Sequence, residues 1–134
     1  MIRLLVDTSA YSAYLRDHPQ VKQAVDEADE LYASVVVLGE LRAGFRSGSR
    51  VRRNEELLAV FLAGPRVQVL PIDEETSIRY AVIHQDLRRR GTLVSPNDLW
   101  IAATAFQHGL RILTTDRDFL QIPQVLVDYI EPLR

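Results

Sequence analysis

The chain has 134 residues, of which 47% are apolar and 25% charged, and its net charge is −2. These are ordinary globular values, and the length predicts a single domain over residues 1–134. The acidic balance excludes a domain that binds nucleic acid through a uniformly basic surface. The absence of cysteine excludes disulfides and zinc–thiolate sites. No apolar run approaches the ~20 residues of a membrane helix, and the start is too short for a signal peptide, so we expect a cytoplasmic protein outside the membrane.

The predicted elements alternate between strands and helices along the chain. Short apolar or β-branched runs predict strands, and apolar residues at helical spacing predict helices. In chain order we expect a strand at 2–6, helices at 10–16 and 17–28, a strand at 31–38, helices at 39–45 and 52–62, a strand at 67–70, helices at 73–90 and 95–107, and strands at 111–114 and 125–130. This alternation indicates an α/β fold with a mostly parallel five-stranded sheet flanked by helices.

Four acidic residues lie where the chain changes direction. Asp7 and Asp116 follow predicted strands, whereas Glu40 and Asp98 lie near the starts of predicted helices. If the first and fourth strands meet at the topological switch point of the sheet, Asp7 and Asp116 face each other across one crevice. Carboxylates gathered in this way repel one another unless a cation neutralises them. Oxygen ligands without His or Cys favour Mg²⁺ or Mn²⁺ over zinc.

Each of these acids also has a purely structural interpretation. Asp7 and Asp116 are suited to cap the helix or turn that follows them. Ser95 and Asp98 form an acidic version of a capping box, and this alone would account for Asp98. Glu40 follows a buried run, where solvation explains a carboxylate less readily. Nearby hydroxyls are candidates for positioning the acids or for ordinary capping, and they belong to Thr8, Ser9, Thr114 and Thr115.

Other catalytic chemistries find little support in the sequence. There is no Gly-rich phosphate loop ending in Gly-Lys-Ser/Thr. The only lysine, Lys22, lies away from the strand ends, which argues against a phosphoryl-accepting domain. The histidines are spread over a helix entrance, a helix middle and a helix end, so RNA cleavage by paired histidines is unsupported.

Fifteen of the sixteen basic residues are arginine, and one stretch of the chain is rich in arginine and free of acids. Its members are Arg42, Arg46, Arg50, Arg52 and Arg53. A second cluster is Arg88, Arg89 and Arg90. Arginine forms bidentate pairs with phosphate, although such a run is equally compatible with a solvated helix face.

Four segments of the chain resemble, in order and spacing, the acidic segments of PIN-domain ribonucleases, with VapC-type toxins as the closest match. They are Leu4–Ala10, Val36–Gly44, Pro96–Ala103 and Leu113–Phe119. The resemblance spans nearly the whole chain and implies a single PIN domain with a three-layer α/β sandwich. Trp100 stands where these toxins more often carry a smaller apolar residue.

The resemblance implies a Mg²⁺-dependent endoribonuclease whose catalytic and metal-binding residues are Asp7, Glu40, Asp98 and Asp116. Thr8, Ser9 and Thr115 would support this site, and Asp118 matches a position that is acidic in some relatives. Mn²⁺ would substitute for Mg²⁺, and cleavage would leave 5′-phosphate and 3′-hydroxyl ends. The resemblance further implies a cognate antitoxin, a homodimer, and contact between RNA or the antitoxin and the arginines of residues 42–53.

Two alternatives remain open at this point. One is a PIN-type nuclease of RNA processing that has no antitoxin. The other is an inactive PIN-fold module that binds a partner through its arginine clusters, although the four intact acids argue against lost activity.

Overall fold

The fold is built on a five-stranded sheet in which every pairing is parallel, as seen in a computed structural model that describes residues 1–134. The strand order is β3-β2-β1-β4-β5, so β1 and β4 are neighbours at the point where the order reverses. The strands are β1 (Arg3–Val6), β2 (Glu30–Ser34), β3 (Val67–Leu70), β4 (Arg111–Thr114) and β5 (Leu126–Tyr129). The predicted parallel five-stranded sheet is confirmed.

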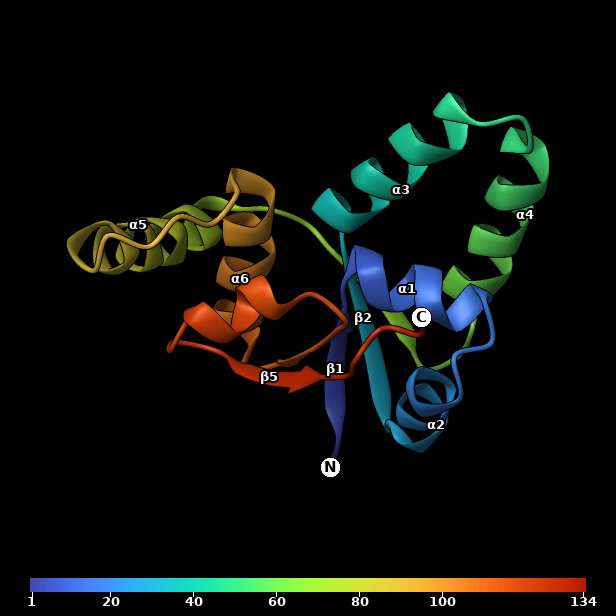
Figure 1. Ribbon diagram of the computed structural model, residues 1–134, viewed down its shortest axis with the longest axis horizontal. Helices are drawn as coiled ribbons and strands as arrows, with labels where there is room; N and C mark the ends of the chain where they lie inside the picture. Colours follow the sequence, from blue (N-terminus) through green and yellow to red (C-terminus); the bar gives the residue numbers. More distant parts are fainter.

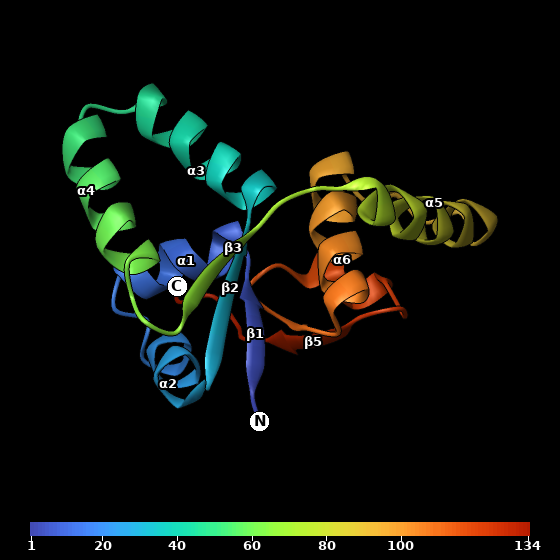
Figure 2. The ribbon, with the colours of Figure 1, turned by 180° about the vertical axis from the view of Figure 1, so that it is seen from behind.

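Helices cover both faces of this sheet, which gives three layers. They are α1 (Thr8–Leu15), α2 (Pro19–Glu27), α3 (Val35–Ser47), α4 (Val51–Leu62), α5 (Glu74–Arg89), α6 (Pro96–His108) and the short 3₁₀ helix η1 (Arg117–Gln121). Figures 1 and 2 show α1 to α4 on one side of the strands and α5 and α6 on the other. Right-handed crossovers produce this arrangement, because the chain runs from β1 to β3 in one direction and returns over the opposite face to β4.

The central strands are apolar because both of their faces are covered. The side chains of Leu4, Leu5 and Val6 in β1 and of Ile112 and Leu113 in β4 are at most 1% exposed. Such continuous burial is typical of a parallel strand between two helical layers. The two central strands therefore form a rigid base, and their carboxyl ends lie next to each other.

The prediction of a strand through residues 35–38 is wrong, because β2 ends at Ser34 and α3 begins at Val35. The Ser34 hydroxyl accepts a hydrogen bond from the Val36 amide at 3.0 Å, which caps the helix. Tertiary packing then overrides the β propensity of the three valines. As a result Glu40 lies in the second turn of α3, not at the helix start that the sequence indicated.

Helix α5 also departs from expectation. Helical spacing within the predicted helix at 73–90 indicates that Ile78 and Val82 face the core, yet these side chains are 54% and 47% exposed. The buried positions are instead Thr76, Ile83 and Leu87. Figure 1 shows the reason, because α5 packs beside α6 and projects away from the sheet.

No helix of the chain is both long enough and apolar enough to cross a bilayer.

A candidate metal centre at the carboxyl end of the sheet

Asp7 and Asp116 lie at the carboxyl ends of the two central strands. Asp7 follows β1, and its amide donates to the Leu113 carbonyl at 3.2 Å, which extends the pairing of β1 with β4. Asp116 lies two residues after β4 and precedes η1. The predicted meeting of these strands at the switch point of the sheet is confirmed, and this is where ligands bind in open α/β sheets.

Hydroxyl groups surround the carboxylate of Asp7, which is only 3% exposed. The Thr114 hydroxyl donates to Oδ2 at 2.6 Å, and the Ser9 hydroxyl lies 2.9 Å from Oδ1 and 3.0 Å from Oδ2. The Ala10 amide donates to Oδ1 at 2.8 Å, so Asp7 does cap α1. Capping thus occupies one oxygen, while the other is held by a residue of the neighbouring strand.

The same hydroxyls hold the loop that carries Asp116. The Asp116 amide donates to Thr114 Oγ1 at 2.9 Å, and the Thr115 amide donates to Ser9 Oγ at 3.0 Å. Thr115 contributes this backbone amide to the network. Thr114 and Ser9 therefore tie the two aspartates to one rigid frame.

Asp98 occupies the third position of α6, and its backbone amide serves the helix entry. Its amide donates to Ser95 Oγ at 3.3 Å, which is the N-cap contact. A reciprocal capping box is formed only at the start of α5, between Asp73 and Thr76. No reciprocal capping box joins Ser95 and Asp98, although a side-chain hydrogen bond with Ser95 lowers the pKa of the Asp98 carboxyl and so opposes the effect of its burial.

Glu40 reaches the same rim from α3. The Thr8 hydroxyl donates to its Oε1 at 2.6 Å, and the Asn97 side-chain amide lies 3.3 Å from its Oε2. Thr8 begins α1 and Asn97 lies in α6, so Glu40 joins helices from the two faces of the sheet. Thr8 supports the acid, as the sequence indicated. Asn97 was not predicted, because nothing in the local sequence distinguishes this contact from an exposed first-turn asparagine.

The carboxylate oxygens of Asp98, Asp116 and Asp118 lie within 4.8 Å of one another. The first two are half-buried and Asp118 is exposed. The Asp118 amide also donates to Asp116 Oδ1 at 2.9 Å, and this contact caps η1. The residue with the weakest sequence signal thus lies in the tightest part of the acidic cluster.

The electrostatics of the cluster fit a bound cation. Burial raises the pKa of Asp98 to about 6, and the charges of Asp116, Glu40 and Asp7 act in the same direction. Burial likewise raises the pKa of Asp7 to about 6, against the hydrogen bonds from Thr114, Ala10 and Ser9, with Asp116 adding to the increase. A divalent ion would remove this penalty by stabilising the charged forms. The donor set is all oxygen, which suits a hard cation.

Most arginines of residues 42–53 lie toward the far end of α3 and the start of α4, beyond the part of α3 that carries Glu40. Arg42 is on α3 and pairs with Glu55 of α4 at 3.1 Å. The others occupy the end of α3, the turn and the start of α4, and Figure 1 shows this turn at the tip of the α3–α4 hairpin. At 1.5 Å per residue, the end of α3 lies about 10 Å along the helix from Glu40. All five arginine side chains are exposed.

The family assignment agrees with this geometry. Residues 4–125 match the PIN domain, and the chain therefore belongs to the PIN-domain family, whose members are metal-dependent nucleases. Within that family it is similar to Ribonuclease VapC4 of Mycobacterium tuberculosis, with 42% identity over 94 residues that cover 70% of this chain and 72% of the relative. The resemblance to VapC ribonucleases noted in the sequence is confirmed.

Solved structures of VapBC complexes share the fold. One is the DNA-bound VapBC of Salmonella typhimurium, at a TM-score of 0.83 and 27% identity, with 96% of this chain and 98% of that chain covered. Another is VapBC-5 of Mycobacterium tuberculosis, a member of the VapBC family of toxin-antitoxin systems. Its TM-score is 0.72 and its identity 28%, with 98% and 99% covered. The predicted PIN-like sandwich is confirmed by these matches.

Proposed function

We propose that this chain is a Mg²⁺-dependent endoribonuclease that acts in the cytoplasm as the toxin of a toxin–antitoxin pair. The observation that supports it best is the acidic cluster at the switch point of the sheet, in a chain of the VapC ribonuclease type. The proposal takes residues 1–134 as one PIN domain. It assigns the reaction to hydrolysis of RNA phosphodiester bonds, with 5′-phosphate and 3′-hydroxyl products.

The proposed metal ligands are Asp7, Asp98 and Asp116, with Glu40 acting directly or through water. A divalent cation bound there would lower the pKa of water and polarise the scissile phosphate. Mg²⁺ is proposed because every donor is a hard oxygen, and Mn²⁺ would substitute because its ligand preference is similar. Asp118 is proposed as a supporting acid, since its carboxylate lies beside those of Asp98 and Asp116.

The chain's own hydroxyls would keep these acids in their working state. Thr114 and Ser9 donate to Asp7 and so favour its ionised form despite burial. Thr8 and Asn97 hold the two oxygens of Glu40 in one orientation. Because these donors come from α1, β4 and α6, the site is preorganised by the fold before RNA binds.

The cognate antitoxin is proposed as the protein partner, because VapBC-5 is described as a member of a toxin-antitoxin family. The arginines from Arg42 to Arg53 are proposed as contacts for RNA or the antitoxin. Apart from the Arg42–Glu55 pair, they form no ion pair within the chain, so their charges are free for a partner.

A homodimer is proposed through the outer face of α5, where Ile78 and Val82 are exposed one turn apart. A second copy would bury these side chains and remove apolar surface from water. Light scattering at micromolar concentration should report a dimer. A double substitution of Ile78 and Val82 by glutamate should give a monomer, and an unchanged mass would contradict this interface.

The nuclease assignment is tested by Asp98→Asn. The neutral isostere keeps the backbone amide that donates to Ser95, so α6 should still form. Cleavage of total cellular RNA in Mg²⁺ should fall by about 100-fold or more, as for the loss of a group that stabilises transition-state charge. Sequencing of the cleaved ends would map the sites and identify the RNA. Cleavage near the parental rate would overturn the assignment, and RNA binding without any cleavage by the parent would favour a binding module.

A further inference from the structure

A hollow of about 380 Å³ lies next to the loop after β4, and none of the proposed metal ligands lines it. It lies between the end of α1 and the last residues of the chain, and we call it the basic hollow. It is lined by Ala13, Arg16, His18, Thr115, Pro132, Leu133 and Arg134. Thr115 immediately precedes Asp116, so the basic hollow adjoins the loop that carries a proposed metal ligand.

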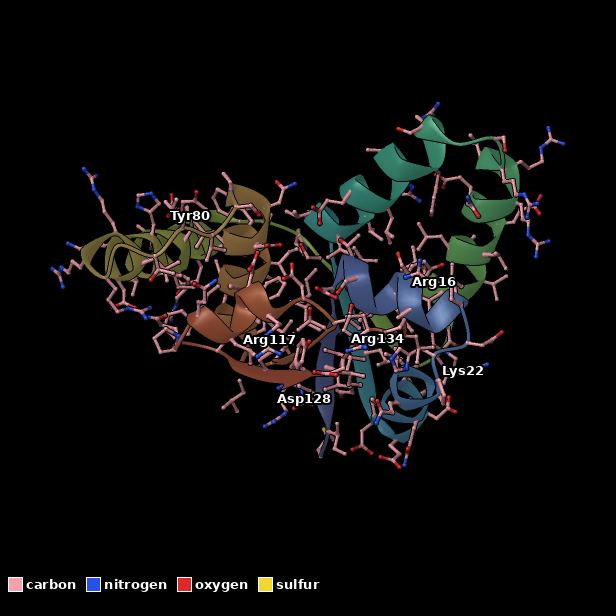
Figure 3. The ribbon with its side chains drawn as sticks, in the orientation of Figure 1. Arg16, Lys22, Tyr80, Arg117, Asp128 and Arg134 are labelled. Carbon is pink, nitrogen blue, oxygen red and sulfur yellow. The ribbon has the colours of Figure 1, made fainter.

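Two cationic side chains line the basic hollow. Arg16 and Arg134 both line it, and neither guanidinium lies within 4 Å of a carboxylate. No acidic residue is among the lining residues. Asp17, the acid nearest to Arg16 in sequence, pairs with Lys22 at 2.9 Å. Figure 3 labels Arg16 and Arg134 in the region of α1 and the C-terminus.

The walls of the basic hollow are held by contacts between distant parts of the chain. The buried ring of His18 lies with Nε2 at 2.8 Å from the Glu131 carbonyl, which fixes the final segment against the start of α2. The Ile130 amide donates to the Thr114 carbonyl at 2.9 Å, and the His18 amide donates to the Ala13 carbonyl at 3.0 Å. These contacts hold the backbone beside Arg16 and the final segment as far as Glu131, which lowers the entropic cost of binding an anion there.

A nuclease with an acidic active site needs positive charge nearby to bind the phosphates of its substrate. The chain has a net charge of −2, and its acidic cluster repels the phosphates of RNA. A strand that reaches the cluster therefore needs positive charge close to the scissile bond. The basic hollow reaches Thr115, the residue before Asp116, whereas the arginines at the tip of the α3–α4 hairpin are not among its lining residues.

We infer that the basic hollow binds a backbone phosphate of the RNA strand next to the bond that is cleaved, with Arg16 and Arg134 as its two cationic contacts. The guanidinium group suits this role because it forms paired hydrogen bonds with phosphate oxygens. Thr115 also lines the basic hollow, and its hydroxyl is a further polar group that could contact a phosphate. The inference rests on the proposed ribonuclease activity and specifies a subsite of the same RNA.

The test measures binding in the absence of cleavage. Fluorescence anisotropy of a labelled single-stranded RNA is followed with the full chain carrying Asp98→Asn, at a series of salt concentrations. Adding Arg16→Ala and Arg134→Ala should weaken binding about tenfold. The slope of log K against the logarithm of the salt concentration should also become shallower by about 1.4, because each phosphate contact contributes about 0.7 for a single strand. The double Arg→Lys variant should retain most of the slope, because it keeps the charges.

The matched control is Arg88→Ala with Arg89→Ala, which removes two positive charges from the far end of α5. Its salt slope should equal that of the Asp98→Asn parent. In the cleaving enzyme, the Arg16/Arg134 double alanine variant should raise KM and leave kcat at saturating RNA within about twofold. An unchanged salt slope, or an equal change in the control, would overturn the inference.

Failure of this inference is distinguishable from failure of the nuclease proposal. If the unsubstituted chain cleaves RNA but the salt slope is insensitive to Arg16 and Arg134, the enzyme assignment stands and the subsite is wrong. If the slope falls as expected but the unsubstituted chain cleaves no RNA in Mg²⁺ or Mn²⁺, the phosphate site stands and the nuclease proposal is wrong.

Discussion

At the scale of single residues, the site depends on hydroxyl groups that serve two neighbours at once. Thr114 is fully buried, donates to Asp7 Oδ2 at 2.6 Å and accepts from the Asp116 amide at 2.9 Å. Ser9 connects the same aspartate to the Thr115 amide. An isolated ionised carboxylate would be costly in this environment, and these donors are what allow Asp7 to be charged there.

Thr114→Val should therefore impair the site without changing its shape. The valine lacks the donor that favours ionised Asp7, so the pKa of Asp7 should rise further above about 6. The acidic limb of the kcat/KM profile should move to higher pH, and chemical denaturation at pH 7.5 should show a loss of about 1–3 kcal/mol.

The matched control for that substitution is Thr104→Val. Thr104 is equally buried, but its hydroxyl donates at 2.9 Å to the Trp100 carbonyl within α6 and contacts no carboxylate. Its pH profile should superimpose on that of the parent. A shift of equal size in both variants would show that burial, not the bond to Asp7, controls the acidic limb.

At the scale of elements, helix ends determine where the acids lie. Asp7 and Asp116 cap α1 and η1, and Ser95 caps α6 so that Asp98 projects in the first turn. The other end of α6 is set by Gly109, which adopts φ +64° and allows the chain to turn directly into β4. This left-handed conformation is accessible to glycine at little cost and disfavoured for other residues.

Two glycine-to-alanine substitutions should change stability in opposite directions. A Cβ meets no atom within 4 Å at Gly109 or at Gly44, so backbone conformation alone decides the outcome. Gly109→Ala should destabilise the fold by about 1–2 kcal/mol because of its positive φ. Gly44→Ala lies inside α3 and should stabilise by about 0.5–1 kcal/mol. Urea denaturation measures both, and effects of the same sign would contradict this account.

At the scale of the whole molecule, the fold brings like charges together and so couples its stability to pH and to metal. Asp7 and Asp98 have pKa values of about 6 in the folded chain, against 3.8 for an unperturbed aspartate. The folded state thus binds more protons than the unfolded state between these values. In the metal-free protein, this contribution to stability is present below about pH 4 and is lost as the pH rises through about 6.

Metal should reverse that loss. At pH 7.5, Mg²⁺ at 100 times its dissociation constant should stabilise the fold by about 2.7 kcal/mol. Protons compete for Asp7 and Asp98 as the pH falls through about 6, so the increment should shrink strongly by pH 5. Thermal denaturation in Mg²⁺ and in EDTA at both pH values measures it. Equal shifts at pH 5 and pH 7.5, or an undiminished shift in Asp98→Asn, would contradict a site built on these carboxylates.

Local sequence determined the elements whose signals are short-range. Apolar runs were sufficient to predict β1 and β4 within about two residues. Ser95 and Pro96 likewise indicated the start of α6, and Gly109 indicated its end. Motif spacing was sufficient for the family, and the role of the four acids that it singled out stays a prediction. Such signals survive in sequence because backbone geometry and capping depend on neighbours along the chain.

Tertiary structure decided what depends on contacts between distant residues. Val35 to Val37 became helical because Ser34 caps α3 and the helix packs on the sheet, and Ile78 became exposed because α5 extends beyond the body of the fold. The approach of Asp98 to Asp116 and Asp118 depended on the packing of α6 against β4 and the segment that follows it. Burial and charge repulsion arise only when these segments meet, because both act through space and not along the chain.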